Sequence, residues 1–581
     1  MLKDKETKKE AIIYSAKEPS KKQYEEFLKF LGRRYGEGTT LTWKKKEGSL
    51  DGFKLEVGDE IFDWTMKGKF NQLKENLTKI SKENENIIPL LKEAIENFKP
   101  KVTPKEVGTV LTVSDGIATV KGLDNATFGE ILIFSNKVSG MVQEIAEDHI
   151  GCILFDKSSL IHEGSSVIRT KKTAGIPVGN GFLGRVVDSL GNPIDDLGEI
   201  KADDYFEIEH KAPGIIMRKP VDQSLKTGIL SIDSMFPIGR GQRELIIGDR
   251  QTGKTQIALD TIINQKGKDV ICVYVAIGQK NSSVVKVRET LKRYNALDYT
   301  IIVSASASEP SPLQYIAPYS GCAMAEYFMS KGKDCLIVYD DLSKHAVAYR
   351  ALSLLLDRSP GREAYPGDVF YLHSRLLERS ARLNENYGGG SITALPIVET
   401  QAGDVAAYIP TNIISITDGQ IFLESDLFFS GQRPAVNVGL SVSRVGGDAQ
   451  TKAMKKAAST LKLDLAQYRE MEVFTQFSSD LDDVTRNQLS HGQKLMRVLR
   501  QNLNSPYEES EEVIILVAAL NHVFDIVNLD DITLCKKSLV EDFNMSHHDI
   551  LDKIEKTKVL DDELKNEIVA ISKEFVSKFN G

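Results

Sequence analysis

One eight-residue segment, Gly248–Thr255, limits most strongly what this chain can fold into. It reads Gly-Asp-Arg-Gln-Thr-Gly-Lys-Thr, follows the apolar run 245–247 and leads into a helical pattern at 256–264. This is the G-x-x-x-x-G-K-T pattern in the strand-to-helix setting that a phosphate-binding loop needs. Its glycines let backbone amides turn inward around a phosphate, and the helix N-terminus favours negative charge. The sequence therefore predicts an α/β domain that binds a nucleotide.

Three side chains of this region carry the expected chemistry. Lys254 is expected to contact the β- and γ-phosphates, and the hydroxyl of Thr255 to bind magnesium. The apolar run 335–339 ends at Asp340, so a buried strand delivers a carboxylate to the same ion; alternatively, Asp340 and Asp341 simply begin a loop. The expected cofactor is ATP or ADP with Mg²⁺. The loop residues expected to bind it are Gly248, Asp249, Arg250, Gln251, Thr252, Gly253, Lys254 and Thr255.

The composition bounds the class of protein. A chain of 581 residues exceeds one hydrophobic core, so three or four domains are expected. A formal net charge of -8 gives no attraction for nucleic acid. Five cysteines without a C-x-x-C pair indicate buried thiols in a reducing compartment. Residues 1–10 lack the apolar core of a secretion signal, and the longest apolar run, 513–520, is shorter than the roughly 18 residues of a spanning helix.

Residues 1–80 are predicted to form a small α+β domain of their own. A helical pattern begins at Tyr24, and the strict alternation in 53–57 with the run 61–64 predicts a hairpin. Thr65 can cap a further helix.

After residue 80 the sequence pattern predicts four further segments. An amphipathic helix is predicted at 87–98. Short strands then predict a small β-barrel, with Asp115-Gly116 as the first turn. Continuous apolar runs such as 270–276 indicate a covered parallel sheet, and the remainder is helical. The expected barrel strands are 109–113, 117–120, 130–134, 141–145 and 151–155. The predicted segments are 1–80 (α+β domain), 81–102 (helix and linker), 103–173 (β-barrel), 174–458 (nucleotide-binding α/β domain) and 459–581 (helical domain).

Five motifs resemble the α subunit of F-type ATP synthases, and the likeness extends over about residues 87–581. The resemblance implies a β-barrel, then a RecA-like P-loop domain, then a C-terminal helical domain, which is the order of the segments above. It also implies partners, namely a catalytic β-type subunit in an α3β3 ring and a central γ-type shaft. The motifs are Gly248–Thr255, Tyr339–Ala346, Pro360–Asp368, Glu399–Asp404 and Ser441–Gly447.

The resemblance also assigns a role to Gln279. The catalytic β subunit carries Glu where this chain has Gln279, and an amide cannot take a proton from an attacking water as a carboxylate can. Alternatively, Gln279 is only a polar residue at the start of a helix. No other acidic side chain stands in an obvious position for a base. The chain is therefore expected to be part of an ATPase or ATP synthase complex without being catalytic alone.

Other site residues follow from the same resemblance. The family's Ser-x-Ser-Arg-Val-Gly arginine, here Arg444, reaches into the neighbouring β site and stabilises charge on the transferred phosphate as an arginine finger. Arg433 and Gln501 are expected near the nucleotide base, although a second family glutamine is Leu503 here. Outside the resemblance, His547-His548 are expected to be adjacent on a helix and to face solvent rather than a metal.

Residues 1–80 resemble a different protein, the C-terminal part of the F-type δ subunit, called OSCP in mitochondria. A generic α+β appendage is the alternative. A δ-like domain on every α chain is expected to bind a second ring or a motility or stator framework. The matching segments are Gly48–Phe53, Val57–Asp59 and Asp63–Lys69.

Three machines stay open at this point. The extra domain favours a specialised F1-like motor, such as the gliding-associated paralogues of wall-less bacteria, over a conventional proton-translocating ATP synthase. A Rho-type RNA-dependent helicase shares the P-loop ring, but the acidic charge balance and the lack of an aromatic-basic strand in 107–170 disfavour it. We expect a cytoplasmic chain, peripheral to the inner face of the membrane, without nucleic acid and without direct membrane insertion.

Overall fold

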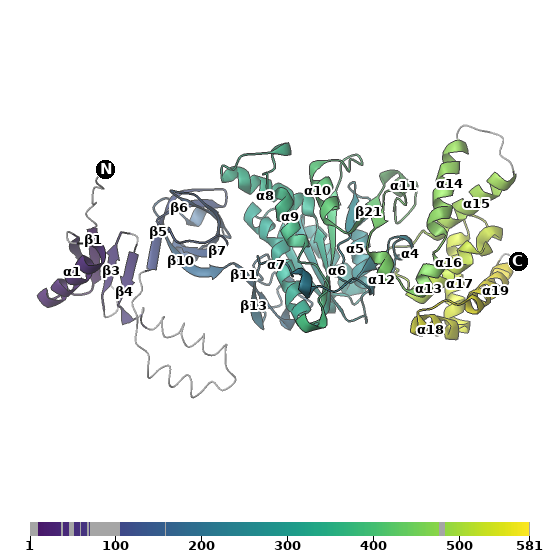
Figure 1. The fold of residues 1–581 in the computed structure, drawn as a ribbon, viewed down its shortest axis with the longest axis horizontal. Coiled ribbons are helices and arrows are strands. Elements are labelled where there is room, and N and C mark those ends of the chain that lie inside the picture. Colours follow the sequence, from purple (N-terminus) through teal and green to yellow (C-terminus); the bar gives the residue numbers. More distant parts are fainter. Residues whose placement is uncertain are drawn as a thin grey trace, which may run out of the picture. The chain divides into compact units, whose positions relative to one another are not determined.

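The computed structural model describes residues 10–36, 39–45, 52–58, 60–66, 69, 105–156, 158–475 and 483–579. The chain divides into two compact units, Met1–Ala174 and Gly175–Gly581 (Figure 1). Each unit is described by itself.

The first unit begins with a small α+β fold, as predicted. Its strands follow the order β2-β1-β3-β4, with β1 and β2 parallel and joined by α1. Ser20 starts α1 with a capping box to Gln23, because its side chain accepts from the Gln23 amide. The predicted hairpin is present, whereas β1 and β2 were not predicted. The elements are β1 (Glu10–Ser15), α1 (Lys21–Tyr35), β2 (Thr40–Lys45), β3 (Lys54–Val57) and β4 (Glu60–Asp63).

Most of the predicted helix after Thr65, and all of the helix predicted at 87–98, lie outside the described residues.

A six-stranded antiparallel barrel forms the rest of the first unit. Its order is β10-β7-β8-β9-β6-β5, and pairing of β10 with β5 closes it. Asp115 and Gly116 form the predicted turn, both with positive φ (45° and 85°). The sheet also continues outward, because β4 pairs with the start of β5 at Glu60–Glu106 and Ile61–Lys105. The strands are β5 (Lys105–Ser114), β6 (Ile117–Lys121), β7 (Glu130–Phe134), β8 (Ser139–Ile145), β9 (Ile150–Leu154) and β10 (Ser166–Thr173).

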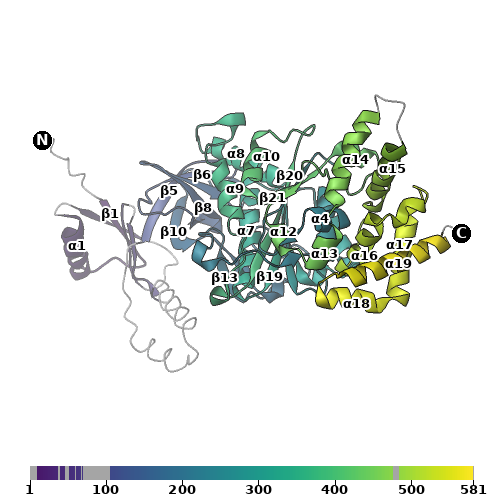
Figure 2. The same ribbon diagram turned by 45° about the vertical axis from the view of Figure 1, so that its right-hand side comes forward.

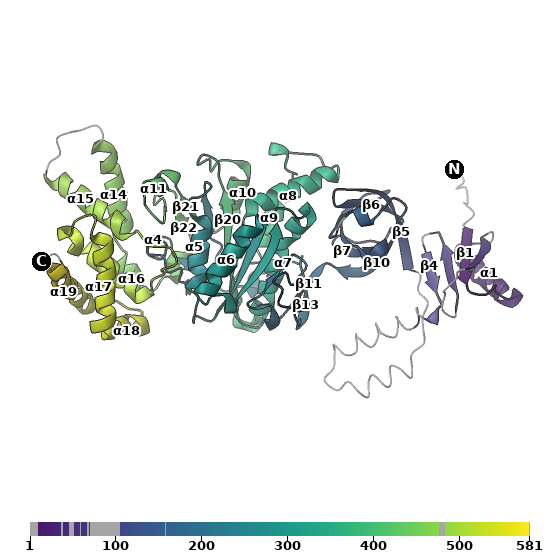
Figure 3. The same ribbon diagram turned by 180° about the vertical axis from the view of Figure 1, so that it is seen from behind.

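An eight-stranded sheet is the centre of the second unit (Figure 3). Its order is β12-β18-β17-β19-β20-β16-β21-β22, and the pairings are parallel except for β21 with β22. Every residue of β18 is buried, and so are nearly all residues of β17, β19 and β20, as the apolar runs predict. The strands are β12 (Val186–Val187), β16 (Leu245–Gly248), β17 (Val270–Gln279), β18 (Thr300–Ser306), β19 (Asp334–Asp340), β20 (Ser391–Glu399), β21 (Gly419–Leu423) and β22 (Val442–Ser443).

Helices α5 to α8 pack against this sheet. Smaller strands and helices surround it. The helices are α4 (Leu230–Met235), α5 (Lys254–Ile263), α6 (Asn281–Arg293), α7 (Ser311–Ser330), α8 (Leu342–Leu355), α9 (Val369–Leu377), α10 (Tyr408–Ile416), α11 (Ser425–Phe429) and α12 (Gly446–Ala449). The smaller strands are β11 (Gly175–Val178), β13 (Asp204–Glu207), β14 (Ser224–Leu225) and β15 (Ile238–Gly239).

The C-terminal part is helical, as predicted, and α13 packs against α16 (Figure 2). The longest apolar run lies in α16 and is a buried core helix. Within the described part of the chain, no helix is long and apolar enough to cross a membrane. The helices are α13 (Lys452–Ala457), α14 (Leu461–Thr475), α15 (Asp483–Val498), α16 (Glu509–Leu520), α17 (Ile532–Ser546), α18 (His548–Thr557) and α19 (Asp562–Phe579).

Two expectations about single side chains can be compared directly. All five cysteines are free and buried, as predicted: Cys152, Cys272, Cys322, Cys335 and Cys535. The expectation that His547 and His548 are adjacent on one helix is wrong. His547 has φ -133° and ψ 39°, which breaks the helix between α17 and α18.

Candidate functional site

The glycine-rich loop lies between β16 and α5. Gly253 takes a left-handed conformation (φ 96°, ψ 14°) directly before α5, which glycine adopts without steric cost. Gln251 also has a positive φ, 64°. Asp249 anchors the loop, because its Oδ1 accepts from Thr400 Oγ1 at 2.6 Å and from the Gly403 amide at 2.9 Å. Burial raises the pKa of Asp249, but these hydrogen bonds outweigh it and the pKa is lowered. The carboxylate of Asp249, the one acidic side chain of this motif, is thus engaged by other groups of the protein.

Lys254 lies at the N-terminus of α5 and is buried. Its ammonium donates to the carbonyl of Gly248 at 2.8 Å and to that of Asp249. Burial lowers the pKa of Lys254, and the nearby carboxylates of Glu399 and Asp341 offset only part of that effect. A buried ammonium held by carbonyls alone is stabilised by an anion, so this geometry suits a phosphate.

Thr255 and Asp340 are brought together as predicted. Thr255 Oγ1 lies 2.9 Å from Asp340 Oδ2. Two side chains of the adjacent strand β17 hold the same carboxylate: Tyr274 donates at 2.5 Å and Gln279 Nε2 at 2.9 Å. Burial, and then the charge of Asp340, raise the pKa of Tyr274 well above its usual value, so it stays a proton donor. A hydroxyl and a carboxylate oxygen are ligands that Mg²⁺ prefers.

The sequence did not predict the part played by Tyr274, which reads as one more member of an apolar strand.

Gln279 is the last residue of β17, and α6 begins only at Asn281. The alternative that Gln279 is a polar residue at the start of a helix is therefore wrong about its position. The residue instead lies at the carboxyl end of a central strand, beside Asp340 on β19.

Two further acidic side chains lie near Lys254. Asp341 caps α8, because its side chain accepts from the Lys344 amide at 2.8 Å, so it begins a helix and not a loop. Burial raises the pKa of Asp341 to about 6. Glu399 ends β20 and pairs with Arg250, whose side chain is 80% exposed. Both carboxylates are thus already engaged by other groups.

An open cleft of about 600 Å³ is lined by Lys254, Thr255, Gln279 and Asp340. The glycine-rich loop, α6 and the ends of β17 and β19 form its walls. Its lining residues are Gln251, Gly253, Lys254, Thr255, Gln256, Leu259, Tyr274, Ala276, Gln279, Ser283, Val284, Lys286, Val287, Thr290 and Asp340.

A smaller, mainly apolar pocket of about 40 Å³ is lined by Thr252 and Gly253 of the same loop. Arg433 and Gln501 both line it, as does Leu503, which is 60% exposed. The guanidinium of Arg433 lies 4.5 Å from the centre of the Phe428 ring. The structure therefore places the residues expected near a base in one pocket next to the loop. The other lining residues are Ile229, Gln256, Ile257, Asp260, Phe428, Pro434 and Asn502.

The Gln501 amide already has three protein partners. Its Nε2 donates to the carbonyls of Gly228 (2.7 Å) and Ser505 (2.8 Å), and its oxygen accepts from the Leu230 amide (3.1 Å). This side chain shapes the pocket by tying segment 228–230 to the C-terminal part.

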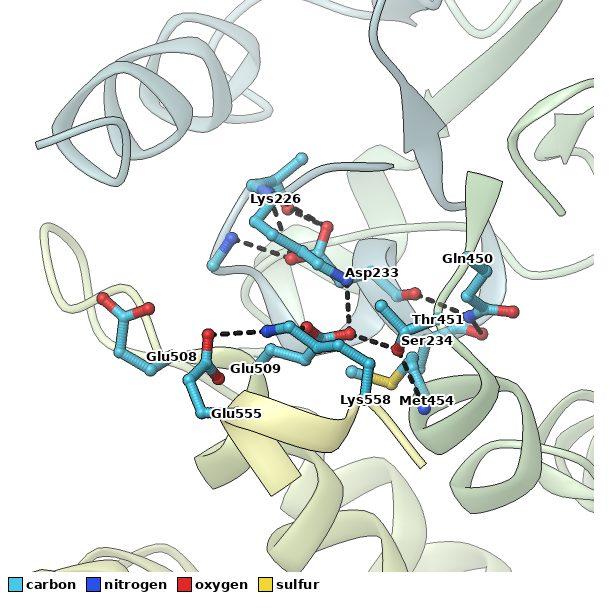
Figure 4. A network of polar contacts seen from close by, with 12 residues as sticks. Lys226, Asp233, Ser234, Gln450, Thr451, Met454, Glu508, Glu509, Glu555 and Lys558 are labelled. Atoms are coloured by element: carbon cyan, nitrogen blue, oxygen red, sulfur yellow. Dashed lines mark hydrogen bonds and ion pairs between the residues drawn. The ribbon is translucent and has the colours of Figure 1, made fainter. Parts of the chain in front are cut away.

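A network of polar contacts also holds the start of this segment (Figure 4). Asp233 accepts from the amides of Thr227 (3.0 Å) and Gly228 (2.9 Å). Lys226 donates to Glu509 of α16 at 2.6 Å, and Lys558 contacts the other oxygen of that carboxylate at 3.0 Å. The wall of the small pocket is thus attached to the helical part of the chain.

Arg444 lies elsewhere, directly after the edge strand β22. Its side chain is exposed, and its amide donates to the Asp418 carbonyl at 3.0 Å. It lines neither the cleft nor the small pocket. Of the predicted site residues, Arg444 is the one that the structure does not bring to the loop.

Comparison with known proteins gives consistent matches along the chain. Models of the ATP synthase alpha/beta family match residues 105–171 (beta-barrel domain), 228–443 (nucleotide-binding domain) and 450–575 (C-terminal domain). A model of the ATP synthase delta (OSCP) subunit matches residues 1–77. The chain is 57% identical to the ATP synthase subunit alpha of Limosilactobacillus reuteri (strain DSM 20016) over 498 residues, 85% of this chain and 98% of the relative. The corresponding protein of Clostridium kluyveri is 56% identical over 496 residues, again 85% and 98%.

Proposed function

Because the chain belongs to the ATP synthase alpha/beta family as an alpha subunit, we propose that it binds a nucleotide without hydrolysing it. Its Lys254 would hold the β- and γ-phosphates in the large cleft, and the base would enter the small pocket beside Arg433. The hydroxyl of Thr255 and the carboxylate of Asp340 would bind Mg²⁺, which screens the phosphate charge.

The observation that carries this proposal is the Gln279–Asp340 hydrogen bond at 2.9 Å. A general base would be needed at this end of β17, and an amide cannot accept the proton of an attacking water. Asp341 is occupied as a helix cap and Glu399 by Arg250.

The purified chain should accordingly bind Mg-ADP at equilibrium while showing no sustained ATP turnover. Steady multiple-turnover hydrolysis by the isolated chain, abolished by Lys254→Ala, would contradict the proposal.

Arg444 would act outside its own chain, as an arginine finger for a neighbouring catalytic subunit. Its exposure at the sheet edge, and the fact that it lines neither cavity, support action in trans. The expected partners are a β-type catalytic subunit in an α3β3 ring and a central shaft.

The choice of machine rests on the relatives. Those named above are ATP synthase subunits, so a conventional proton-translocating synthase fits at least as well as a specialised motor. A motility framework has no support among them, and 57% identity over 498 residues rules out the helicase alternative. The chain would then lie in the cytoplasm, peripheral to the membrane.

The delta-like N-terminal domain distinguishes this chain from the alpha relatives named above. The alignment with the first of them covers 98% of that relative but only 85% of this chain. We propose the boundaries 1–80, 81–102, 103–173, 174–458 and 459–581 for its segments. A ring with three such chains would carry three copies of the N-terminal domain, whereas a single peripheral stalk needs one anchor. The additional copies would be available to a second ring or a stator framework.

A further inference from the structure

Two histidines and one aspartate converge in the C-terminal helical part, on residues that the proposed function does not use. His491 lies on α15, and His522 and Asp525 lie on the short turn after α16. The Nδ1 atom of His491 is 2.9 Å from Asp525 Oδ1, and Nδ1 of His522 is 2.8 Å from Oδ2. The ring centres are 4.2 Å apart, and one ligand atom from each of the three residues lies within 4.8 Å of the others.

Packed elements hold this cluster in place. The 3-10 helix Val523–Ile526 is anchored by Val523 and Phe524, which are 3% and 2% exposed. His522 precedes it in a left-handed conformation (φ 61°, ψ 21°), which sets the direction of its Cα–Cβ bond. Ligands carried by packed elements keep their geometry better than ligands on free loops.

The cluster opens to solvent on one side. The His491 side chain is 14% exposed, whereas those of Asp525 and His522 are 36% and 64% exposed. The ammonium of Lys494 donates to the backbone carbonyl of Asp525. An ion can therefore enter from solvent, and a water molecule can complete its coordination.

We propose that His491, His522 and Asp525 form a binding site for a divalent transition-metal ion, with Zn²⁺ as the preferred ion. Zn²⁺ takes imidazole nitrogen and carboxylate oxygen in tetrahedral geometry, whereas Mg²⁺ prefers oxygen ligands alone. On binding, each imidazole carries its proton on Nε2 and turns the Nδ1 lone pair toward the metal, so the two Nδ1–carboxylate hydrogen bonds are exchanged for metal bonds. The ion links α15 to the turn after α16.

The test is a titration of the full chain with ZnCl2 alone, after chelation and without nucleotide, in competition with a chromophoric chelator. The wild type is expected to bind one equivalent. His522→Ala should weaken binding by at least about tenfold, since even second-shell changes cost 10–100-fold. The matched control is His548→Ala, which replaces an exposed histidine of the same helical part, 3.9 Å from Asp552 and outside the cluster, and it should bind as the wild type does.

Substitution with Co²⁺ gives an independent readout of the ligands. A visible absorption band of low-symmetry Co²⁺ is expected for the wild type and for His548→Ala, and its loss for His522→Ala and His491→Ala. Equal Zn²⁺ affinity of the wild type and both cluster variants would overturn the proposal. So would a wild type without any bound equivalent, because the cluster would then be a hydrogen-bonded group only.

Discussion

Replacing Glu509 should loosen the attachment between the small pocket and the helical part. The Glu509 carboxylate is 3% exposed and contacts Lys226, itself 16% exposed, at 2.6 Å. Removing one partner of such a buried pair costs about 3–5 kcal/mol, because the other charge stays buried. The second contact, to Lys558, adds little, since that side chain is 41% exposed and screened by solvent. The expected loss for Glu509→Ala is therefore about 3–5 kcal/mol.

Native-state hydrogen exchange with mass spectrometry can measure this loss locally. Protection of the α16 amides should fall by roughly 140- to 3,700-fold in Glu509→Ala, at 1.4 kcal/mol per tenfold. Glu509→Gln keeps the shape and an oxygen that can accept a hydrogen bond from Lys226, so it should cost less than Glu509→Ala, about 1–2 kcal/mol. The control Glu574→Ala breaks the exposed pair with Lys578 on α19 and should leave α16 protection unchanged.

The pH dependence supplies a further check. Burial raises the pKa of Glu509, but the charge of Lys226 and its hydrogen bonds outweigh burial, and the pKa is lowered. The stabilisation is thus present above the unfolded-state pKa of about 4.3 and is lost as the pH falls through the folded-state value. If Glu509→Ala changed α16 protection less than tenfold at neutral pH, the reasoning about this buried pair would be refuted.

Three other predictions concern nucleotide binding and assembly. Lys254→Ala should weaken binding of Mg-ADP to the isolated chain, measured by calorimetry, while the assembled complex still hydrolyses ATP; unchanged affinity would contradict the phosphate role. Arg444→Ala should leave that binding intact but reduce turnover of the α–β assembly about 10³-fold or more, roughly 4 kcal/mol of barrier; near-normal turnover would exclude the finger. Deletion of residues 1–80 should preserve ring formation and ATPase activity while abolishing higher-order association in native mass spectrometry, and a truncated chain that forms no ring would disprove it.

Local patterns predicted much of this molecule, and long-range contacts account for what they missed. The loop 248–255 and five of the six barrel strands follow from short motifs and periodicity, whereas β10, which closes the barrel by pairing with β5, was not among the predicted strands. Strand β1 was missed because its short apolar pattern adjoins a charged segment and becomes buried only on pairing with β2 and β3. The contact of Tyr274 with Asp340 depends on the order of strands in the sheet, which no single segment encodes.

The hydrogen bonds of Gln501 with Gly228 and Leu230 also depend on long-range contacts, since Gln501 is more than 250 positions from both residues. Sequence could place Gln501 near a base pocket through resemblance, but not its three protein partners.

The burial of all five thiols makes the chain well suited to site-specific labelling. Burial raises the pKa of every cysteine, so almost no thiolate forms at neutral pH and maleimides find no native target. One cysteine introduced at an exposed position, such as Lys578, would then be the single reactive thiol on the folded chain. A fluorophore or bead attached there could follow the chain in an assembled complex without removal of any native cysteine.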